Sequence, residues 1–402
     1  MRSILILGAA NDQLPLILKA KELGYYVIVC DYTLTNPGLK FVDKHYHIDY
    51  MDRDAVLKVA ESENIDGIVS NSEPVMQIVA YVSKKLGLRG NSVDSVKNVC
   101  EKDLFRKVQS RAGVFLPRQN VVKSDAEALS FAQTLNFPII FKPCRNSASR
   151  GISKINSFRS EDIVSAFDAC KEESWNKHVL IEEFVEMPSN VVIEGDLFIY
   201  DGIILWDGFF HTYRSPFNKL VPMTYSAPLQ ISSAQMDLIK NTISKIIKEA
   251  GLSFGQFNIE MYFTLSNELF VIEINPRQGG RGIPRFIENY SGIDYSKLLV
   301  SLCVNDYSYE SQIKDKRLVK SRFLTRHVVY SHQNGIFEGL KIDSGIADKI
   351  SKTEYLVDEG ALVHKCINGT DAIAIVDVQF ENLEEQNYYI HHLEEMIKPC
   401  IS

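Results

Sequence analysis

Two neighbouring segments of the sequence, FNIEMYF and ELFVIEINPR, combine acidic, amide and basic side chains in a strand-like pattern. Apolar residues alternate with Glu260 in the first segment and with Glu273 and Asn275 in the second. Such alternation is typical of a strand with one buried face, whose scattered polar residues face water. Here the polar residues form a set that ends at Arg277 and the glycine-rich stretch QGGRG, which suggests a shared chemical role.

We predict that the two segments form a β-hairpin with residues 266–267 at its tip. In that register Glu260 lies opposite Glu273. Asn258 lies opposite Asn275 on the same face. Like charges on facing residues destabilise a sheet, so this arrangement requires a cation. The other face is expected to be buried and consists of Phe257, Ile259, Met261, Ile272 and Ile274.

Two carboxylates and an amide are hard oxygen ligands of the kind that Mg²⁺ or Mn²⁺ prefers. Mg²⁺ usually keeps several waters and takes further ligands from substrate phosphates. The predicted metal ligands are Glu260, Glu273 and Asn275. The simpler interpretation is a pair of solvated glutamates on an exposed strand face, because a register slip of one residue would place the two carboxylates on opposite faces.

A candidate phosphate site follows the predicted strand PIIFK, which ends at Lys142. The next loop is rich in small and polar residues and runs through Ser147 and Ser149 to Gly151. Successive backbone N–H groups in such a loop bind phosphate oxygens, and a lysine supplies positive charge. A plain surface loop is the alternative, since the spacing of a Walker A motif is absent.

Two other segments allow more than one interpretation. VLIEEFVE is either a strand that emerges into solvent or a linker strand whose backbone at Glu183 and Val185 pairs with an adenine edge. GAANDQ, after the first predicted strand, lacks the GxGxxG fingerprint, which disfavours a dinucleotide-binding dehydrogenase.

The elements that position these residues fall into four predicted regions. Strand and helix patterns alternate over residues 1–97, which indicates a parallel sheet covered by helices. Residues 98–188 are predicted to form a helical linker and a lid subdomain, and residues 189–324 a subdomain with the metal and substrate residues. Residues 325–402 are strand-rich. The predicted class is therefore α/β and α+β, in several domains.

Periodicity predicts several individual elements within these regions. Helical patterns run over 93–112 and 233–250, and a final helix is expected over 383–398. The polar, proline-bearing segment 211–228 has no clean periodicity and is predicted to be a loop.

Composition limits the classes of function. The chain has 402 residues, 45% of them hydrophobic and 24% charged, which indicates a globular protein of more than one domain. Its net charge of −7 disfavours nucleic acid as a partner. The 7 cysteines form no CxxC pair, as expected in a reducing cytoplasm. No apolar run approaches the ~18 residues of a membrane span, so no membrane partner is expected.

In their order along the chain, these motifs resemble the ATP-grasp superfamily in its carboxylate–amine ligase branch. The matching segments are CEKDLFRK, PIIFKPCRNSASRG, IEEFVE and FNIEMYF with ELFVIEINPR. The resemblance covers roughly residues 1–400. It implies an N-terminal α/β domain, a central ATP-grasp fold of two α+β subdomains, and a C-terminal domain like that of biotin carboxylase.

The resemblance also implies roles for individual residues. The implied ATP-binding residues are Lys102, Lys142, Ser147, Ser149, Gly151, Glu182, Glu183, Val185 and Asn190. The two lysines would hold phosphates, Asn190 the ribose, and the adenine would be held by Glu182, Glu183 and Val185. At 187–192 this chain reads MPSNVV where many members carry Gly-x-Glu, which weakens the ribose assignment. Arg277 and Lys142 are the implied catalytic residues.

The chemistry implied by the resemblance joins a carboxylate to an amine, with ADP and phosphate as products. Arg281 suits a substrate carboxylate, because a guanidinium forks around two oxygens; a structural ion pair is the alternative. Glu73, in SNSEP, is a candidate for holding the amine, and Arg214 a further substrate residue. The expected partners are small molecules, amino acids among them. Many relatives are dimers, and the sequence leaves the oligomeric state open.

Three other functions stay open on the same fold. Biotin carboxylase has a VEHP-like stretch after the arginine, where this chain has GGRGIP. Carbamoyl phosphate synthetase large subunits contain two grasp units, and this chain has room for one. A non-catalytic nucleotide-binding module is the third alternative, and the complete set of Glu260, Glu273, Asn275 and Arg277 disfavours it.

Overall fold

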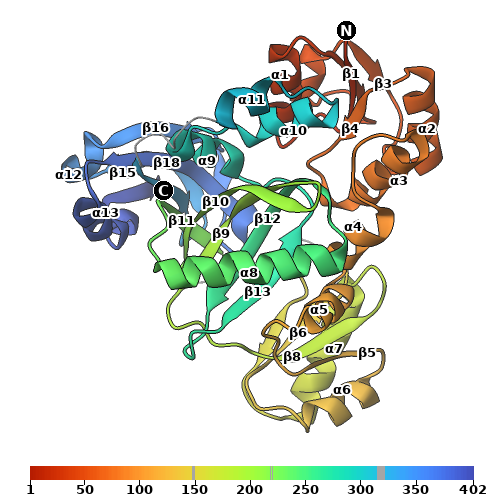
Figure 1. The fold of residues 1–402 in the computed structure, drawn as a ribbon. Helices are drawn as coiled ribbons and strands as arrows, with labels where there is room; N and C mark the ends of the chain where they lie inside the picture. Colours follow the sequence, from red (N-terminus) through yellow and green to blue (C-terminus); the bar gives the residue numbers. More distant parts are fainter. Residues whose placement is uncertain (147–149, 218, 220, 315–321) are drawn as a thin grey trace.

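The structure is a computed structural model that describes residues 1–146, 150–217, 219, 221–314 and 322–402. Figure 1 shows an N-terminal region, a lid built around its own small sheet, and a C-terminal region, all placed around a central sheet. The fold class is mixed, with a parallel sheet at the N-terminus and antiparallel sheets elsewhere, as predicted.

The N-terminal region is built on a parallel sheet with strand order β3-β2-β1-β4. Its strands are β1 (Ser3–Leu7), β2 (Tyr26–Cys30), β3 (Lys44–Tyr46) and β4 (Gly67–Val69). Its helices are α1 (Leu14–Glu22), η1 (Pro37–Phe41), α2 (Arg53–Ser62), η2 (Glu73–Val75) and α3 (Met76–Leu86). Ile4 and Ile6 pack into one core, and Leu5 and Leu7 into another. Both faces of the sheet are therefore buried, which is typical of a parallel sheet.

The lid contains an antiparallel sheet with strand order β5-β8-β6-β7. Its strands are β5 (Gln119–Val122), β6 (Ile139–Pro143), β7 (Ser153–Ile155) and β8 (Val179–Glu183). Its helices are α6 (Asp125–Ala132) and α7 (Ser160–Glu173). The helical pattern at 93–112 forms two helices, α4 (Val93–Cys100) and α5 (Lys102–Arg111), which connect the N-terminal region to the lid.

The central sheet is eight-stranded, with strand order β13-β12-β9-β10-β11-β14-β18-β16. Its strands are β9 (Val191–Tyr200), β10 (Ile203–Arg214), β11 (Pro222–Ala227), β12 (Phe254–Phe263), β13 (Leu269–Asn275), β14 (Phe323–Tyr330), β16 (Ile350–Tyr355) and β18 (Ala372–Phe380). The prediction of a loop over 211–228 is wrong, because β10 extends to Arg214 and β11 occupies much of the remainder. Pairing along the sheet, which no local pattern reveals, stabilises both strands there.

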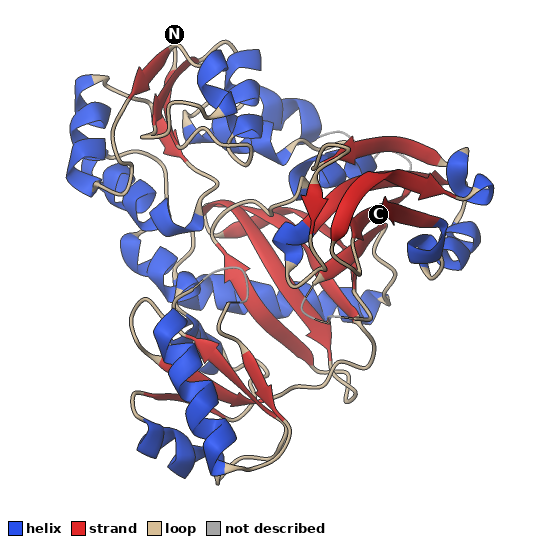
Figure 2. Cartoon of the chain, turned by 180° about the vertical axis from the view of Figure 1, so that it is seen from behind, coloured by secondary structure: helices blue, strands red, loops and turns tan. Residues whose placement is uncertain are grey.

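One face of the central sheet is covered by α8 (Ser233–Ala250), as Figure 1 shows. Its buried isoleucines, spaced for one helical stripe, pack against that face; they are Ile239, Ile243, Ile246 and Ile247. Figure 2 shows the opposite face, around which the other regions lie. Part of that face and the N-terminal region are joined by α9 (Ile283–Ser291), α10 (Tyr295–Cys303) and α11 (Ser308–Lys314), whose side chains share one core with β1 and β2.

The C-terminal region adds a three-stranded sheet with strand order β17-β15-β19. Its elements are β15 (Gly335–Ile342), α12 (Ser344–Ala347), β17 (Leu362–Val363), η3 (Gly369–Asp371), α13 (Leu383–Ile390), α14 (Leu393–Met396) and β19 (Ile397–Ile401). The single final helix predicted over 383–398 is wrong, since two short helices precede a strand. The four domain boundaries stay a prediction, and β14 begins next to the one placed at residue 324.

Candidate active site

The hairpin that carries the acidic pair forms as predicted. β12 and β13 pair in an antiparallel register in which Glu260 faces Glu273 and Asn258 faces Asn275. A β-bulge follows between Glu260 and Met261, so that the register shifts by one residue toward the tip. The bulge turns Ile272 away from the α8 core and toward Tyr262 and Phe270. The expectation that Ile272 shares the buried face with Phe257 is therefore wrong.

A third carboxylate extends the acidic row. Glu194 on β9 faces Glu260, so Glu194, Glu260 and Glu273 lie on one face of three neighbouring strands. Burial and the Glu260 carboxylate raise the pKa of Glu194 to about 8. Its Oε2 accepts a hydrogen bond of 3.0 Å from the Thr212 hydroxyl. Glu194 was not among the residues predicted from the sequence, although VVIEGDLF has the same alternation of acidic and apolar residues as the two hairpin strands.

Each of the two predicted metal carboxylates has a cation beside it. Arg214 Nη2 lies 2.6 Å from Glu260 Oε2, and Lys102 Nζ lies 3.8 Å from Glu273 Oε2. Burial acts to raise the pKa of Glu273, but Lys102 and the Asn275 amide outweigh it and lower that pKa. The amide donates to Glu273 Oε1 at 3.1 Å. Glu273 is therefore held as an anion, the form that binds a metal.

The donor set fits Mg²⁺ in kind. It offers carboxylate and amide oxygens on adjacent strands, and the bound ion would take its remaining ligands from phosphate and water. Over the described ranges of the chain, no group of three or more His, Cys, Asp and Glu side chains is arranged to hold a metal. The residues present thus suit an Mg²⁺ ion with few protein ligands, which is the usual arrangement in nucleotide-binding enzymes.

The lysine that ends β6 belongs to a buried charged cluster. Lys142 Nζ contacts Glu182 Oε1, and Arg106 Nε donates to Glu182 Oε2 at 2.9 Å. Burial acts to raise the pKa of Glu182, but the two cations outweigh it and lower the pKa to about 2. Because both cations occupy its carboxylate, a contact of Glu182 with adenine would have to run through its backbone. Arg106, which sequence reasoning missed, has no distinguishing local signal.

The segment predicted to bind adenine has one backbone N–H group that is available as a hydrogen-bond donor. Glu183 Oε1 accepts hydrogen bonds from the backbone N of Asn136 at 2.9 Å and from Asn136 Nδ2 at 3.0 Å. The Val185 carbonyl accepts the Tyr262 hydroxyl at 2.6 Å. Among the described residues the Val185 N–H has no hydrogen-bond partner, which suits an acceptor on an adenine edge. The Asn190 carbonyl accepts from Arg214 N at 2.8 Å, and its ribose role stays a prediction.

The loop after Lys142 is described only at its ends. Ser147 and Ser149 lie outside the described residues. Gly151 has φ +70°, and a Cβ at this position would lie 2.7 Å from Glu173 Cβ. A glycine is therefore required where the loop returns to the lid.

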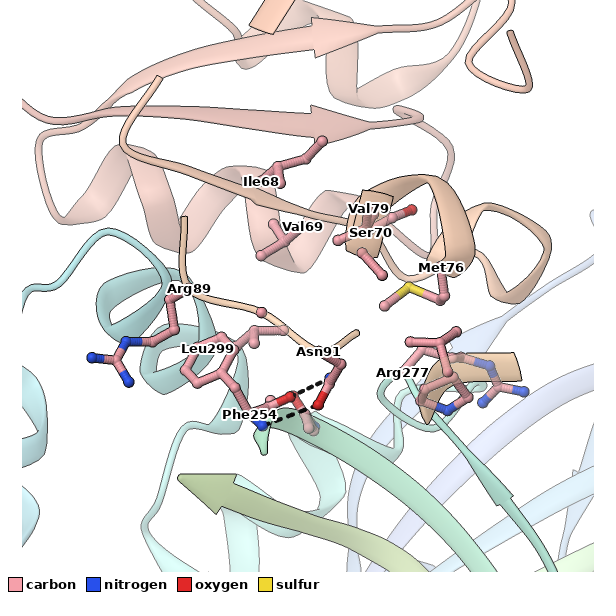
Figure 3. Close-up of a pocket in the computed structure, with 16 residues that line it drawn as sticks. Ile68, Val69, Ser70, Met76, Val79, Arg89, Asn91, Phe254, Arg277 and Leu299 are labelled. Carbon is pink, nitrogen blue, oxygen red and sulfur yellow. Dashed lines mark hydrogen bonds between the residues drawn. The ribbon is translucent and has the colours of Figure 1, made fainter. Parts of the chain in front are cut away.

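Arg277 and Glu73 join the hairpin to the N-terminal region. Glu73 Oε2, in η2, lies 3.5 Å from Arg277 Nη2. Burial raises the pKa of Glu73, while Arg277 acts in the opposite direction. Figure 3 shows Arg277 beside Met76 and Ser70, at the edge of a mainly apolar cavity of about 40 Å³. That cavity is too small for a nucleotide.

Arg281 lies apart from Arg277, against the C-terminal region. It has a left-handed backbone with φ +52°, and its guanidinium hydrogen-bonds with Tyr225. Among the described residues no carboxylate forms an ion pair with Arg281, although, against the effect of burial, the Glu194 carboxylate acts on it electrostatically and, with Tyr225, raises its pKa. A substrate anion is therefore a suitable partner, whereas Arg214, the other predicted substrate residue, pairs with Glu260.

Asp196 is a further buried acid that sequence reasoning missed. Its carboxylate accepts from Gln256 Nε2 at 2.7 Å and from Asn258 Nδ2 at 3.0 Å. It also accepts from the backbone N of Gly279 at 3.0 Å. Asp196 thus connects β9 and β12 to the loop that holds Arg277 and Arg281.

Comparison with known proteins agrees with this geometry. Residues 135–285 match a family described as the ATP-grasp domain. Formate-dependent phosphoribosylglycinamide formyltransferase of Methanocaldococcus jannaschii is 24% identical over 294 residues, which cover 70% of this chain and 72% of the relative. The uncharacterized protein y4rH of Sinorhizobium fredii is 25% identical over 309 residues, 75% of this chain. This chain spans only 63% of that relative's length.

Among solved structures, L-amino acid ligase from Bacillus licheniformis superposes with a TM-score of 0.81 at 16% identity, covering 100% of this chain and 99% of that one. The two proteins share a fold, and residues 135–285 of this chain match the ATP-grasp domain.

Proposed function

We propose that this protein is an ATP-dependent ligase that activates a carboxylate as an acyl phosphate and joins it to an amine, releasing ADP and phosphate. The observation that carries the proposal is the register that places Glu260 opposite Glu273, with Lys102 beside Glu273. A non-catalytic nucleotide-binding module would have no use for such a pair of facing carboxylates, which is costly to a sheet.

In the proposed reaction a substrate carboxylate oxygen attacks the γ-phosphorus of ATP, and the bond to the β–γ bridging oxygen breaks. The amine nitrogen then attacks the acyl carbon, loses a proton, and the bond to phosphate breaks. Lys102 and Lys142 would offset charge on the phosphate oxygens, and Arg277 the charge that develops on the transferred group. Mg²⁺, held by Glu260, Glu273 and Asn275, would supply further charge compensation on the phosphates; Mn²⁺ is an alternative ion.

For the substrates, we propose a small carboxylate, such as an amino acid, bound by Arg281, and an amine near Glu73. The half-buried Arg281 guanidinium lacks an ion pair with any described carboxylate, and a bound anion would supply one. Glu73 faces the same loop through Arg277. The names of the similar proteins include a formate-dependent enzyme and an amino-acid ligase, so both formate and amino acids belong in the first panel.

The direct test measures ADP and phosphate release from ATP and Mg²⁺ over pairs of carboxylates and amines. Release is expected only when a correct pair is present. Bicarbonate belongs in the panel, because release with bicarbonate in place of an organic carboxylate would favour the carboxylating alternative. AMP as the product, or no nucleotide product with any pair, would overturn the ligase assignment.

Glu273→Gln is expected to lower turnover by about 100-fold or more, because it removes a charged ligand from the metal site. Glu268→Gln provides the matched control, as the same substitution on the same hairpin at an exposed position near the tip. Circular dichroism should show both variants folded. Wild-type turnover by Glu273→Gln would contradict the metal assignment.

A further inference from the structure

Residues of the C-terminal region contact both the backbone and the guanidinium of Arg281. Arg326, on β14, donates from Nη1 to the carbonyl of Arg281 at 3.2 Å and to that of Gly282 at 2.7 Å. Its other donors bind both carboxylate oxygens of Asp377 on β18, at 2.7 and 2.9 Å. Arg326 and Asp377 are buried. The ion pair therefore fixes Arg326 as a rigid support under the left-handed backbone of Arg281.

The guanidinium itself lies against the turn that begins at Asn368. A Cβ built on Gly369 would lie 1.5 Å from Arg281 Nη2 and 2.4 Å from Cζ. Gly369 does not have a positive φ, so its backbone conformation accepts alanine. The three atoms nearest to the added carbon all belong to the Arg281 guanidinium. The turn is held in place by hydrogen bonds to the Asp371 carboxylate from the backbone N–H groups of Ile367 and Asn368, at 2.8 and 2.9 Å.

We propose that Gly369 and Arg326 are positioning residues for substrate recognition, and that the C-terminal region forms the back wall of the carboxylate subsite. This inference rests on the proposed function, in which Arg281 binds the substrate carboxylate. The wall sets the position of the guanidinium, and thereby which carboxylates reach the transferred phosphoryl group. The lid residues assigned to ATP and the hairpin residues assigned to the metal contact neither Gly369 nor Arg326 in any described interaction.

Gly369→Ala tests this wall. We expect the KM for the carboxylate to rise by about tenfold to a hundredfold, because a displaced guanidinium misplaces the substrate. The KM for ATP and the melting temperature should stay close to wild type. Gly360→Ala is a control in the same region: nothing lies within 4 Å of its added carbon, and its φ of +86° adds backbone strain alone, so stability should fall while the carboxylate KM should not change.

A double-mutant cycle separates positioning from a general structural effect. Arg281→Ala should raise the carboxylate KM, and adding Gly369→Ala to it should have little further effect, because no guanidinium remains to be displaced. Additive effects of the two substitutions, or an unchanged carboxylate KM in Gly369→Ala, would overturn the inference. The proposed function would still stand in that case, provided that the wild-type protein turns over a carboxylate–amine pair. Absence of turnover by the wild type with any pair would overturn the proposed function and this inference with it.

Discussion

The candidate site includes a cluster of charged side chains that are buried from water. Glu182 and Arg106 are each 1% exposed, and Lys142 is 10% exposed. Burying such charges is costly unless every one has a partner, so removal of one member leaves an unpaired charge in the interior. Glu182 is the shared partner of both cations, which makes it the member whose loss is most damaging.

Glu182→Gln is therefore expected to lower the free energy of unfolding by about 3 kcal/mol, because Arg106 keeps its charge without a carboxylate and Lys142, whose pKa burial already lowers, loses the partner that favours its charged form. Denaturant unfolding of the two proteins measures the difference. Glu183→Gln, at the next residue and only half-buried, should cost much less. Equal losses in both variants would contradict the role of the buried cluster.

Individual site residues can be predicted from the sequence where polar side chains alternate with apolar ones on a strand. Residues that only tertiary contacts bring to the site cannot be predicted in this way. Glu260 and Glu273 were identified because the alternation and the hairpin tip together define their register. Arg106 is one of many charged residues on α5, and only packing of that helix shows that its guanidinium faces Glu182. The Arg281 guanidinium lies against the turn at Gly369, which is distant in sequence, and no local pattern reveals that contact.

At the scale of elements, the middle of the central sheet depends on a close approach of two strands. A Cβ on Gly195 of β9 would lie 2.2 Å from the backbone oxygen of Gly208 on β10. Since a backbone atom in a paired strand cannot move aside easily, the two strands would have to separate. Glycine at 195 is thus a requirement of the pairing between β9 and β10, next to Glu194.

Gly195→Ala is expected to lower the free energy of unfolding by about 3 kcal/mol through this clash. Gly202→Ala also places alanine at positive φ, but its nearest neighbour lies 3.8 Å away, so its cost should be about 1 kcal/mol, from backbone strain alone. Thermal and denaturant unfolding of both variants give the comparison. A Gly195→Ala protein as stable as Gly202→Ala would show that the sheet can relax around the added carbon.

Distant backbone contacts decide where some helices end. The helical patterns predicted over 93–112 form α4 and α5, which meet at Glu101 without a glycine or proline, and the N–H of Lys102 donates to the carbonyl of Cys144 at 2.8 Å. That bond brings the first turn of α5, and with it Lys102, to the end of β6. Long periodic segments such as α8, with Ser232 and Gln235 as a capping box, were predicted correctly.

For the whole molecule, one sheet connects the ATP-grasp strands with the C-terminal region. Strands β14, β18 and β16 extend the sheet that begins at β13. His327 on β14 is buried in this continuation, with its Nδ1 at 2.9 Å from the Thr224 hydroxyl of β11. The order of strands was not predictable, because periodicity identifies strands but says nothing about which ones pair.

Lowering the pH is expected to destabilise the folded protein through His327. Burial lowers its pKa from 6.5 to about 4, so the unfolded chain binds a proton in this range while the folded protein does not. Stability from this residue is therefore lost as the pH falls from 6.5 toward 4, by about 2 kcal/mol between pH 7 and pH 5. His327→Gln should lack this component, whereas exposed His364→Gln should keep it. The same pH dependence in all three proteins would contradict the assignment.

The helices of the described residues include none that is both long and apolar enough to cross a membrane. All seven cysteines lie in described residues and are free. The cytoplasmic location stays a prediction from the sequence, and the oligomeric state stays open.

The contact between α5 and β13 has a consequence for association with other chains. β13 is an edge of the eight-stranded sheet, and an exposed edge is a template for adding foreign strands. Arg106 Nη1 donates to the Ile272 carbonyl at 3.1 Å, and Gln109 Nε2 to the Val271 carbonyl at 2.9 Å. These side chains occupy acceptors that an aggregating strand would need, so the residue that fixes Glu182 also protects the strand of Glu273 against edge-to-edge polymerisation.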